Sequence, residues 1–164
     1  MAKFPEYLKD LRKSGQISFT LEQAVRDLQT SKHNVLVSIR RVKKHGEIIN
    51  PARGLYVIIP PEHQLQGCLP AEELVPILMK HLGIKYYVGL LSAAMYHGAT
   101  HQKPNSFQII SDKQIRKNLK FGKVSIDAIY KKSLINLPIK EFAVDSGYLK
   151  VSSPELTAMD LLLY

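Results

Sequence analysis

Apolar residues in the first third of the chain recur at helical spacing and then at the spacing of strands. Three segments have the periodicity of amphipathic helices: 4–13, 20–29 and 32–45. Two predicted strands follow, 47–50 and 55–59, with a turn at 51–54 that contains a proline and a glycine. Two helices across a tight break, followed by a hairpin, are the outline of a winged helix-turn-helix, which is a DNA-reading unit.

The helix boundaries in this region have local signals of their own. Thr20 stands at an N-cap position, with Gln23 three residues later as in a capping box. Ser31 is the predicted N-cap of the third helix. Gly46 marks the end of that helix, because glycine is favoured just past a C-cap and the residues before it are cationic.

The third predicted helix has an apolar side and a cationic side. The apolar side consists of Val35, Leu36, Ile39 and Val42. The opposite side carries His33, Asn34, Val37, Arg40, Arg41 and Lys44. A cationic helix face is often only solvated, but here it follows a helix and a tight break and precedes a hairpin with a basic tip. We therefore interpret this helix as the one that reads DNA.

In a helix-turn-helix the second helix of the pair lies in the major groove. Asn34 is suited to pair with adenine through two hydrogen bonds, and Arg40 or Arg41 with guanine. The other candidates have different expected targets. Ser31, Lys32 and Lys44 are expected to contact phosphates, and His33 a base or the backbone. Arg53, at the hairpin tip, is expected to enter a narrow minor groove.

The remainder of the chain predicts a second, mixed domain. Helices are expected over 70–82, 86–96 and 155–164, the last capped by Ser153 with Pro154 at its first position. Strands are expected over 107–111, 124–130, 139–144 and 148–151, with a hairpin turn at 145–147. The predicted class is therefore α+β, with a winged helix over 1–62, a linker over 63–69 and a mixed α/β domain over 70–164 that is truncated at its C-terminal end.

Charge and composition narrow the classes of function. The chain has 164 residues, 45% of them hydrophobic, and a formal net charge of +9, which favours a polyanionic partner such as nucleic acid. Residues 1–60 carry 11 Lys and Arg against five Asp and Glu, so the winged helix region is the more cationic part. Cys68 is the single cysteine, which excludes an internal disulfide. Without a signal sequence or an apolar run of membrane-spanning length, we expect a cytoplasmic protein.

A second group of cations lies in the later part of the chain, and two interpretations of it remain open. It forms either a second surface for a polyanion or a charged face that keeps the domain soluble. Its members are Lys113, Arg116, Lys117, Lys120 and Lys123.

The residues do not form a recognisable catalytic constellation, and we expect no cofactor and no metal. His97 and His101 have chelating spacing, but a third ligand is not apparent and a structural role is favoured. The alternative function is a nuclease or nucleic-acid-modifying enzyme targeted by the winged helix, and its candidate residues are Asp112, Asp145, Glu141 and Lys140. A protein-interaction adaptor whose winged helix does not touch DNA is a third interpretation.

Three stretches resemble the AbiEi antitoxins of bacterial type IV toxin–antitoxin systems. They are YYVGLLSAAMYHGATHQKPNSFQIIS at 86–111, GLYVIIPPE at 54–62 and VSSPELTAMDLLLY at 151–164. The resemblance implies a winged helix that binds inverted repeats upstream of its own operon and represses it. It also implies a C-terminal domain with antitoxic activity.

The resemblance further implies a cognate toxin, which is similar to a nucleotidyltransferase and is encoded by the neighbouring gene. The antitoxin would counteract this toxin without a stable complex, in a system that defends against phage by abortive infection. The sequence leaves open whether one dimer or two monomers bind the inverted repeats.

Overall fold

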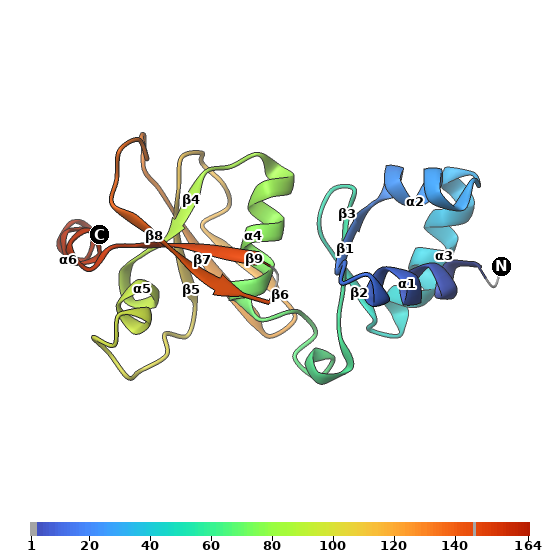
Figure 1. Ribbon diagram of the computed structural model, residues 1–164, viewed down its shortest axis with the longest axis horizontal. Helices are drawn as coiled ribbons and strands as arrows, with labels where there is room; N and C mark the ends of the chain where they lie inside the picture. The colour runs from blue at the N-terminus through green and yellow to red at the C-terminus, as the bar shows by residue number, and fades with distance from the viewer. Residues whose placement is uncertain (1–2, 146) are drawn as a thin grey trace. The chain divides into compact units, whose positions relative to one another are not determined.

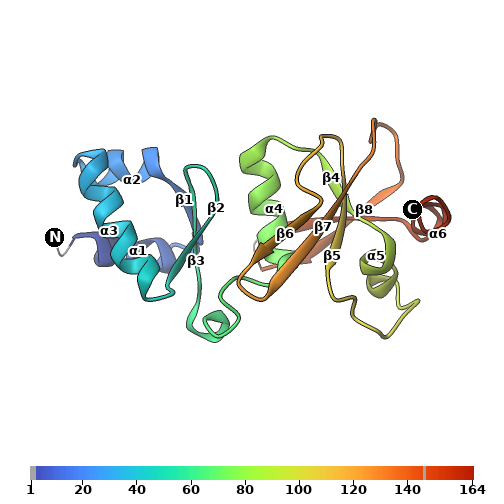
Figure 2. The ribbon, with the colours of Figure 1, turned by 180° about the vertical axis from the view of Figure 1, so that it is seen from behind.

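The computed structural model describes residues 3–145 and 147–164. The chain divides into two compact units, Met1–Leu69 and Pro70–Tyr164, each with its own sheet (Figures 1 and 2). Among the described helices, none has both the length and the apolar character that crossing a bilayer requires.

The first unit is a winged helix-turn-helix. Its helices are α1 (Lys3–Lys13), α2 (Leu21–Leu28) and α3 (Lys32–Lys44). Its strands are β1 (Ser18–Thr20), β2 (Ile48–Ala52) and β3 (Leu55–Ile58), which form an antiparallel sheet in the order β1-β3-β2. In Figure 1 the three helices gather on one side of this small sheet. The predicted elements and fold class of this unit are confirmed.

An aromatic cluster lies at the centre of the first unit. The rings of Phe19 and Tyr56 are stacked with centroids 5.5 Å apart, and Phe4 meets Phe19 edge-on at 6.2 Å. Val35 and Ile39 of α3 belong to the same buried cluster, so β1, β3, α1 and α3 share one core. Aromatic pairs of this geometry contribute about 1 kcal/mol each beyond their buried area.

The hairpin differs in one respect from the prediction. The predicted turn covers 51–54, but β2 continues through Ala52 and the turn consists of Arg53 and Gly54. Pro51 is tolerated within β2 because this strand lies at the edge of the sheet and its register shifts between Ile49 and Ala52. Gly54 has a φ of +76°, which glycine adopts without strain.

The segment predicted to be a linker packs with the first unit. A short 3-10 helix, η1 (Pro61–His63), opens it, and Cys68 and Leu69 at its end are fully buried. Burial raises the pKa of the Cys68 thiol to about 12, so this cysteine remains protonated at neutral pH.

The second unit is built on a mixed six-stranded sheet in the order β6-β7-β5-β4-β9-β8. Its strands are β4 (Tyr86–Val88), β5 (Phe107–Ser111), β6 (Asn118–Phe121), β7 (Val124–Tyr130), β8 (Ile139–Val144) and β9 (Gly147–Ser152). The β5–β7 and β4–β9 pairs are parallel and the others antiparallel. The helices are α4 (Ala71–Leu82), α5 (Leu90–Tyr96) and α6 (Pro154–Leu163). The predicted mixed domain is confirmed, although residue 146 of the expected 145–147 turn lies outside the described residues.

The helix predicted over 86–96 is wrong in its first four residues. Tyr86–Val88 forms β4, which lies between β5 and β9, and only Leu90–Tyr96 is helical. Aromatic and β-branched residues favour a strand, and an apolar run buried on both faces has no period that distinguishes it from a buried helix. Gly89 separates the two elements, and a Cβ there would lie 3.0 Å from Cδ1 of Ile110.

A buried polar network holds α6 against the sheet. The Tyr87 hydroxyl donates to Oδ2 of Asp160 at 2.7 Å, and Nζ of Lys131 lies 3.1 Å from Oδ1 of the same carboxylate. Asp160 is fully buried, and burial together with this carboxylate raises the pKa of Tyr87. These three residues come from β4, the segment after β7 and α6, so no local sequence pattern indicates their contact.

The network gives α6 an unusual polarity. Its buried residues are Leu156, Thr157 and Asp160, so two of the three are polar. Met159, Leu162 and Leu163 are instead exposed. The position of α6 therefore depends on satisfied polar groups more than on an apolar face, because a buried carboxylate without its partner is strongly unfavourable.

Replacing Lys131 by Met should lower the free energy of unfolding by about 3 kcal/mol, because it leaves the buried Asp160 carboxylate without its cation. The triple variant Tyr87→Phe/Lys131→Met/Asp160→Leu should recover most of this loss, since neither an unpaired charge nor an unsatisfied buried hydroxyl remains. Urea unfolding followed by circular dichroism measures both effects. Lys132→Met is the matched control at an exposed neighbour, and an equal loss in that variant would contradict the assignment.

Candidate nucleic-acid interface

The packing of α3 determines which of its side chains face solvent. Val35 and Ile39 are 1% and 3% exposed, and Val42 packs against the same core. On the opposite side His33, Arg40 and Lys44 are exposed, in the i, i+7, i+11 relation that places residues on one helical stripe. The apolar and cationic sides expected from the sequence therefore lie on opposite sides of the helix, with Leu36 only half-buried.

The remaining candidates on α3 flank this stripe. Lys32 lies exposed in the first turn, and Asn34 and Arg41 lie exposed on one side of the stripe. With Lys43, the last turn carries three cations, which the negative pole of the helix dipole stabilises. The face has an excess of positive charge, because α3 contains no Asp or Glu.

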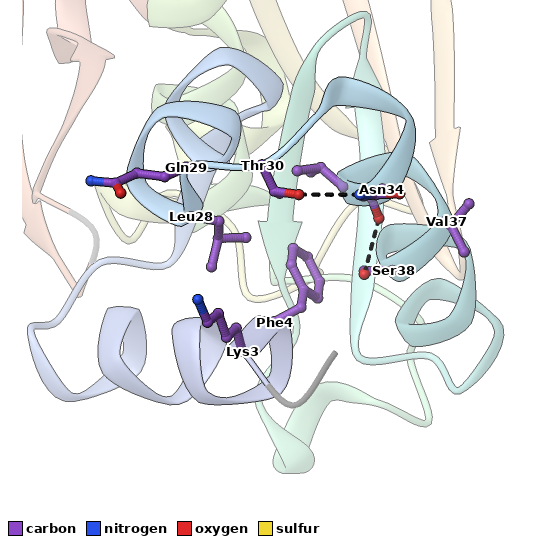
Figure 3. A pocket seen from close by; sticks show the side chains of 9 residues that line it. Lys3, Phe4, Leu28, Gln29, Thr30, Asn34, Val37 and Ser38 are labelled. Carbon is purple, nitrogen blue, oxygen red and sulfur yellow. Dashed lines mark hydrogen bonds between the residues drawn. The ribbon is translucent and has the colours of Figure 1, made fainter.

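The N-terminus of α3 is fixed by side-chain hydrogen bonds (Figure 3). The Ser31 hydroxyl accepts from the backbone N–H of Asn34 at 3.2 Å and so caps the helix as predicted. The side-chain amide of Asn34 donates to Oγ1 of Thr30 at 3.2 Å, and the Ser38 hydroxyl donates to the backbone carbonyl of Asn34 at 3.1 Å. An amide NH2 has two donors, so Asn34 keeps one N–H and its oxygen for a base.

Sequence reasoning did not find Thr30 and Ser38. They lie four residues before and four residues after Asn34, which is the spacing of neighbours on one helical face. This spacing was the available signal. The Thr30 hydroxyl holds the side-chain amide of this candidate base-reading residue, whereas the Ser38 hydroxyl bonds its backbone carbonyl.

Arg53 is positioned by a different part of the first unit. It is exposed in the two-residue turn of the β2–β3 hairpin. The carbonyl of the adjacent Gly54 accepts from the backbone N–H of Leu21 at 3.0 Å, which attaches the hairpin tip to the start of α2. The β2–β3 hairpin is the wing of this unit. It is therefore joined to the helix-turn-helix at its tip as well as at its base.

The second group of cations lies around strand β6. Lys117, Lys120 and Lys123 are exposed along or beside this edge strand, and Arg116 precedes them. Nζ of Lys113 instead donates to the carbonyl of Gly83 at 3.2 Å. Lysines on an edge strand also prevent pairing with another sheet, so both interpretations of this patch remain compatible with the fold.

The carboxylates of the nuclease interpretation are not brought together. Asp112 follows β5 and Asp145 follows β8, and the sheet order places β4 and β9 between those strands. Three inter-strand spacings separate them by about 14 Å, which is too far for one divalent ion. Asp112 accepts a hydrogen bond from the backbone N–H of Lys85 at 3.0 Å, which is a structural role.

His97 also has a structural environment. Its Nε2 lies 2.6 Å from the carbonyl oxygen of Ser152, and its ring meets Phe142 edge-on. Within residues 3–145 and 147–164, no group of three or more His, Cys, Asp or Glu side chains is arranged to hold a metal ion.

Replacing Ser31 by Ala should lower the free energy of unfolding by about 1 kcal/mol, because the first turn of α3 loses its N-cap. Ser38→Ala is the matched control on the same helix. Its hydroxyl only bonds back to a carbonyl of its own helix, and alanine has the higher helix propensity, so that variant should be neutral or slightly more stable. Urea unfolding followed by circular dichroism at 222 nm distinguishes the two, and equal losses would show that the cap is not the cause.

Comparison with known proteins finds a family match within the second unit. Residues 87–164 match the sequence model of the family described as AbiEi antitoxin C-terminal domain. The match begins in β4 and includes β5 to β9 together with α5 and α6. No curated protein matches the chain. Residues 87–164 thus belong to the AbiEi antitoxin C-terminal domain family.

Proposed function

We propose that this chain is a DNA-binding repressor and antitoxin of a type IV toxin–antitoxin system. It binds inverted repeats upstream of its own operon through the first unit. Through the second unit it counteracts a nucleotidyltransferase-like toxin encoded by the neighbouring gene, without forming a stable complex. The observation that carries the DNA-binding part is the exposed cationic side of α3 on a winged helix-turn-helix.

The residues proposed to contact DNA are those on and around α3 and at the wing tip. Asn34, Arg40 and Arg41 contact base edges in the major groove. Lys32 and Lys44 contact phosphates, as does Ser31, whose hydroxyl can donate to a phosphate while it accepts the capping hydrogen bond. His33 contacts base or backbone, and Arg53 enters the minor groove.

The antitoxin part of the proposal rests on family membership. An AbiEi antitoxin domain implies a cognate toxin. The exposed lysines along β6 are the candidate surface of this unit for a polyanion, and a shared polyanionic target is one route by which an antitoxin opposes a toxin without touching it.

Operator binding should weaken steeply with salt, with a log–log slope on the order of −5 to −7 if six to eight phosphates are neutralised. The variant Arg40→Ala/Arg41→Ala should abolish the mobility shift of a duplex from upstream of its own operon at about 150 mM salt, with an unchanged circular dichroism spectrum. Lys9→Ala/Lys13→Ala, which removes the same charge from the exposed side of α1, is the matched control and should bind nearly normally. A flat salt response, or equal losses in both double variants, would refute the assignment of α3.

Antitoxicity should survive the loss of operator binding, because the two activities are assigned to different units. When both genes are expressed from foreign promoters, Arg40→Ala/Arg41→Ala should protect growth against the neighbouring toxin as well as the unaltered chain does. The variant Lys117→Ala/Lys120→Ala/Lys123→Ala should bind operator normally. It should protect growth less well if the β6 lysines form the surface that carries the antitoxic activity. Loss of protection in the α3 variant, with normal protein levels, would contradict the division of roles.

A further inference from the structure

A cavity of about 260 Å³ opens beside the N-terminal end of α3 (Figure 3). The start of α1, the turn between α2 and α3, and the first turns of α3 enclose it. Of the described residues that line it, Asn34 alone is also proposed to contact DNA. The proposed DNA contacts therefore give the cavity itself no role.

The floor of this cavity is apolar. Phe4 and Val35, which are 3% and 1% exposed, belong to the core of the first unit, and Leu28 packs against that core. In Figure 3 the side chains of Phe4 and Leu28 point into the cavity. An occupant that reaches this floor gains about 25 cal/mol for each Å² of apolar surface removed from water.

The wall on the α3 side is polar, and the opposite side carries a cation. Thr30, Asn34 and Ser38 form the hydrogen-bonded wall described above. Among the described residues of the lining, Lys3 is the single charged one, and Figure 3 shows its amine extending from α1 toward Leu28 and Phe4. Gln29, in contrast, points away from the cavity. The polar groups and the cation favour an occupant with one anionic end.

The volume limits the size of the occupant. Since a water molecule takes about 30 Å³ of liquid volume, the cavity has room for a molecule of about ten non-hydrogen atoms. Larger cofactors and drug-sized ligands need pockets of about 300–1,000 Å³.

We propose that this cavity binds a small amphipathic carboxylate of about ten non-hydrogen atoms, which regulates operator binding. Its apolar part packs on Phe4, Leu28 and Val35, and its carboxylate accepts hydrogen bonds from Lys3 and the Asn34 amide. A DNA phosphate would also meet Lys3, but a phosphodiester has no apolar group to place on this floor. A free carboxylate with an apolar body therefore fits the cavity better.

The regulatory part of the inference rests on the proposed function, because Asn34 is also a proposed base-reading residue. A carboxylate bound to its amide N–H competes with the base for the same donor. Occupation of the cavity should therefore weaken operator binding, whereas binding of the carboxylate itself requires no DNA.

The binding test uses the full chain labelled with ¹⁵N and benzoate as the probe. Benzoate should cause saturable shifts of the amide signals of Thr30, Asn34, Val35 and Ser38. Uncharged benzamide, of the same size, should bind more weakly. Lys3→Glu should weaken benzoate binding at least tenfold, while Lys9→Glu, the same charge change elsewhere on α1, should leave it unchanged.

A second variant tests the cavity rather than the charge. Ser38→Met places a larger side chain at the wall and should abolish the benzoate shifts while the spectrum remains that of a folded protein. Absence of saturable shifts at the lining residues, or equal effects of Lys3→Glu and Lys9→Glu, would overturn the proposal.

Operator titrations with and without benzoate separate this proposal from the proposed function. Weaker operator binding in the presence of benzoate, abolished by Ser38→Met, supports regulation. Benzoate binding to a chain that does not bind operator overturns the proposed function alone. Benzoate binding without any effect on operator affinity overturns the regulatory part. If Lys3→Glu weakens operator binding and benzoate causes no shifts, Lys3 contacts the DNA backbone and the carboxylate site is refuted.

Discussion

The burial of Val35 and Ile39 in the aromatic core of the first unit is the constraint on which its candidate function depends. A helix advances about 100° per residue, so fixing these two side chains inward fixes the stripe of His33, Arg40 and Lys44 outward. The cationic face is thus a consequence of packing as much as of composition. A substitution that weakens the packing of Phe19 or Phe4 would change the orientation of α3, or make it less well defined, without altering any residue proposed to contact DNA.

In the second unit, α6 is positioned by a buried polar network more than by apolar packing. The inward side of α6 is polar, and its carboxylate requires Lys131 and Tyr87 at once. Such a network adds little net stability, because desolvation offsets the attraction, but it tolerates few alternative positions of the helix. The two units therefore illustrate two ways of positioning a helix, one by apolar shape and one by the pairing of a buried charge.

The sequence is sufficient where the signal is local. Ser31 caps α3, Thr20 caps α2, and the apolar period of α3 correctly predicts which of its sides is buried and which is cationic. The sequence is insufficient at Tyr86–Val88, because an apolar run buried on both faces fits a strand and a helix equally well. It also does not indicate that Lys131 and Asp160 meet, or that Thr30 and Ser38 hold Asn34 beside a cavity, because these contacts depend on how the elements pack.

The wing is closed at both ends, which has a consequence for the entropy of DNA binding. At its base the backbone N–H of Ile59 donates to the carbonyl of Glu47, and at its tip Leu21 donates to Gly54. A hairpin fixed at base and tip has little conformational freedom left to lose when it meets a groove, so less of the interaction free energy is spent on ordering it. The same closure makes the length of the hairpin a structural requirement of α2, since an inserted residue would detach the helix start from the wing.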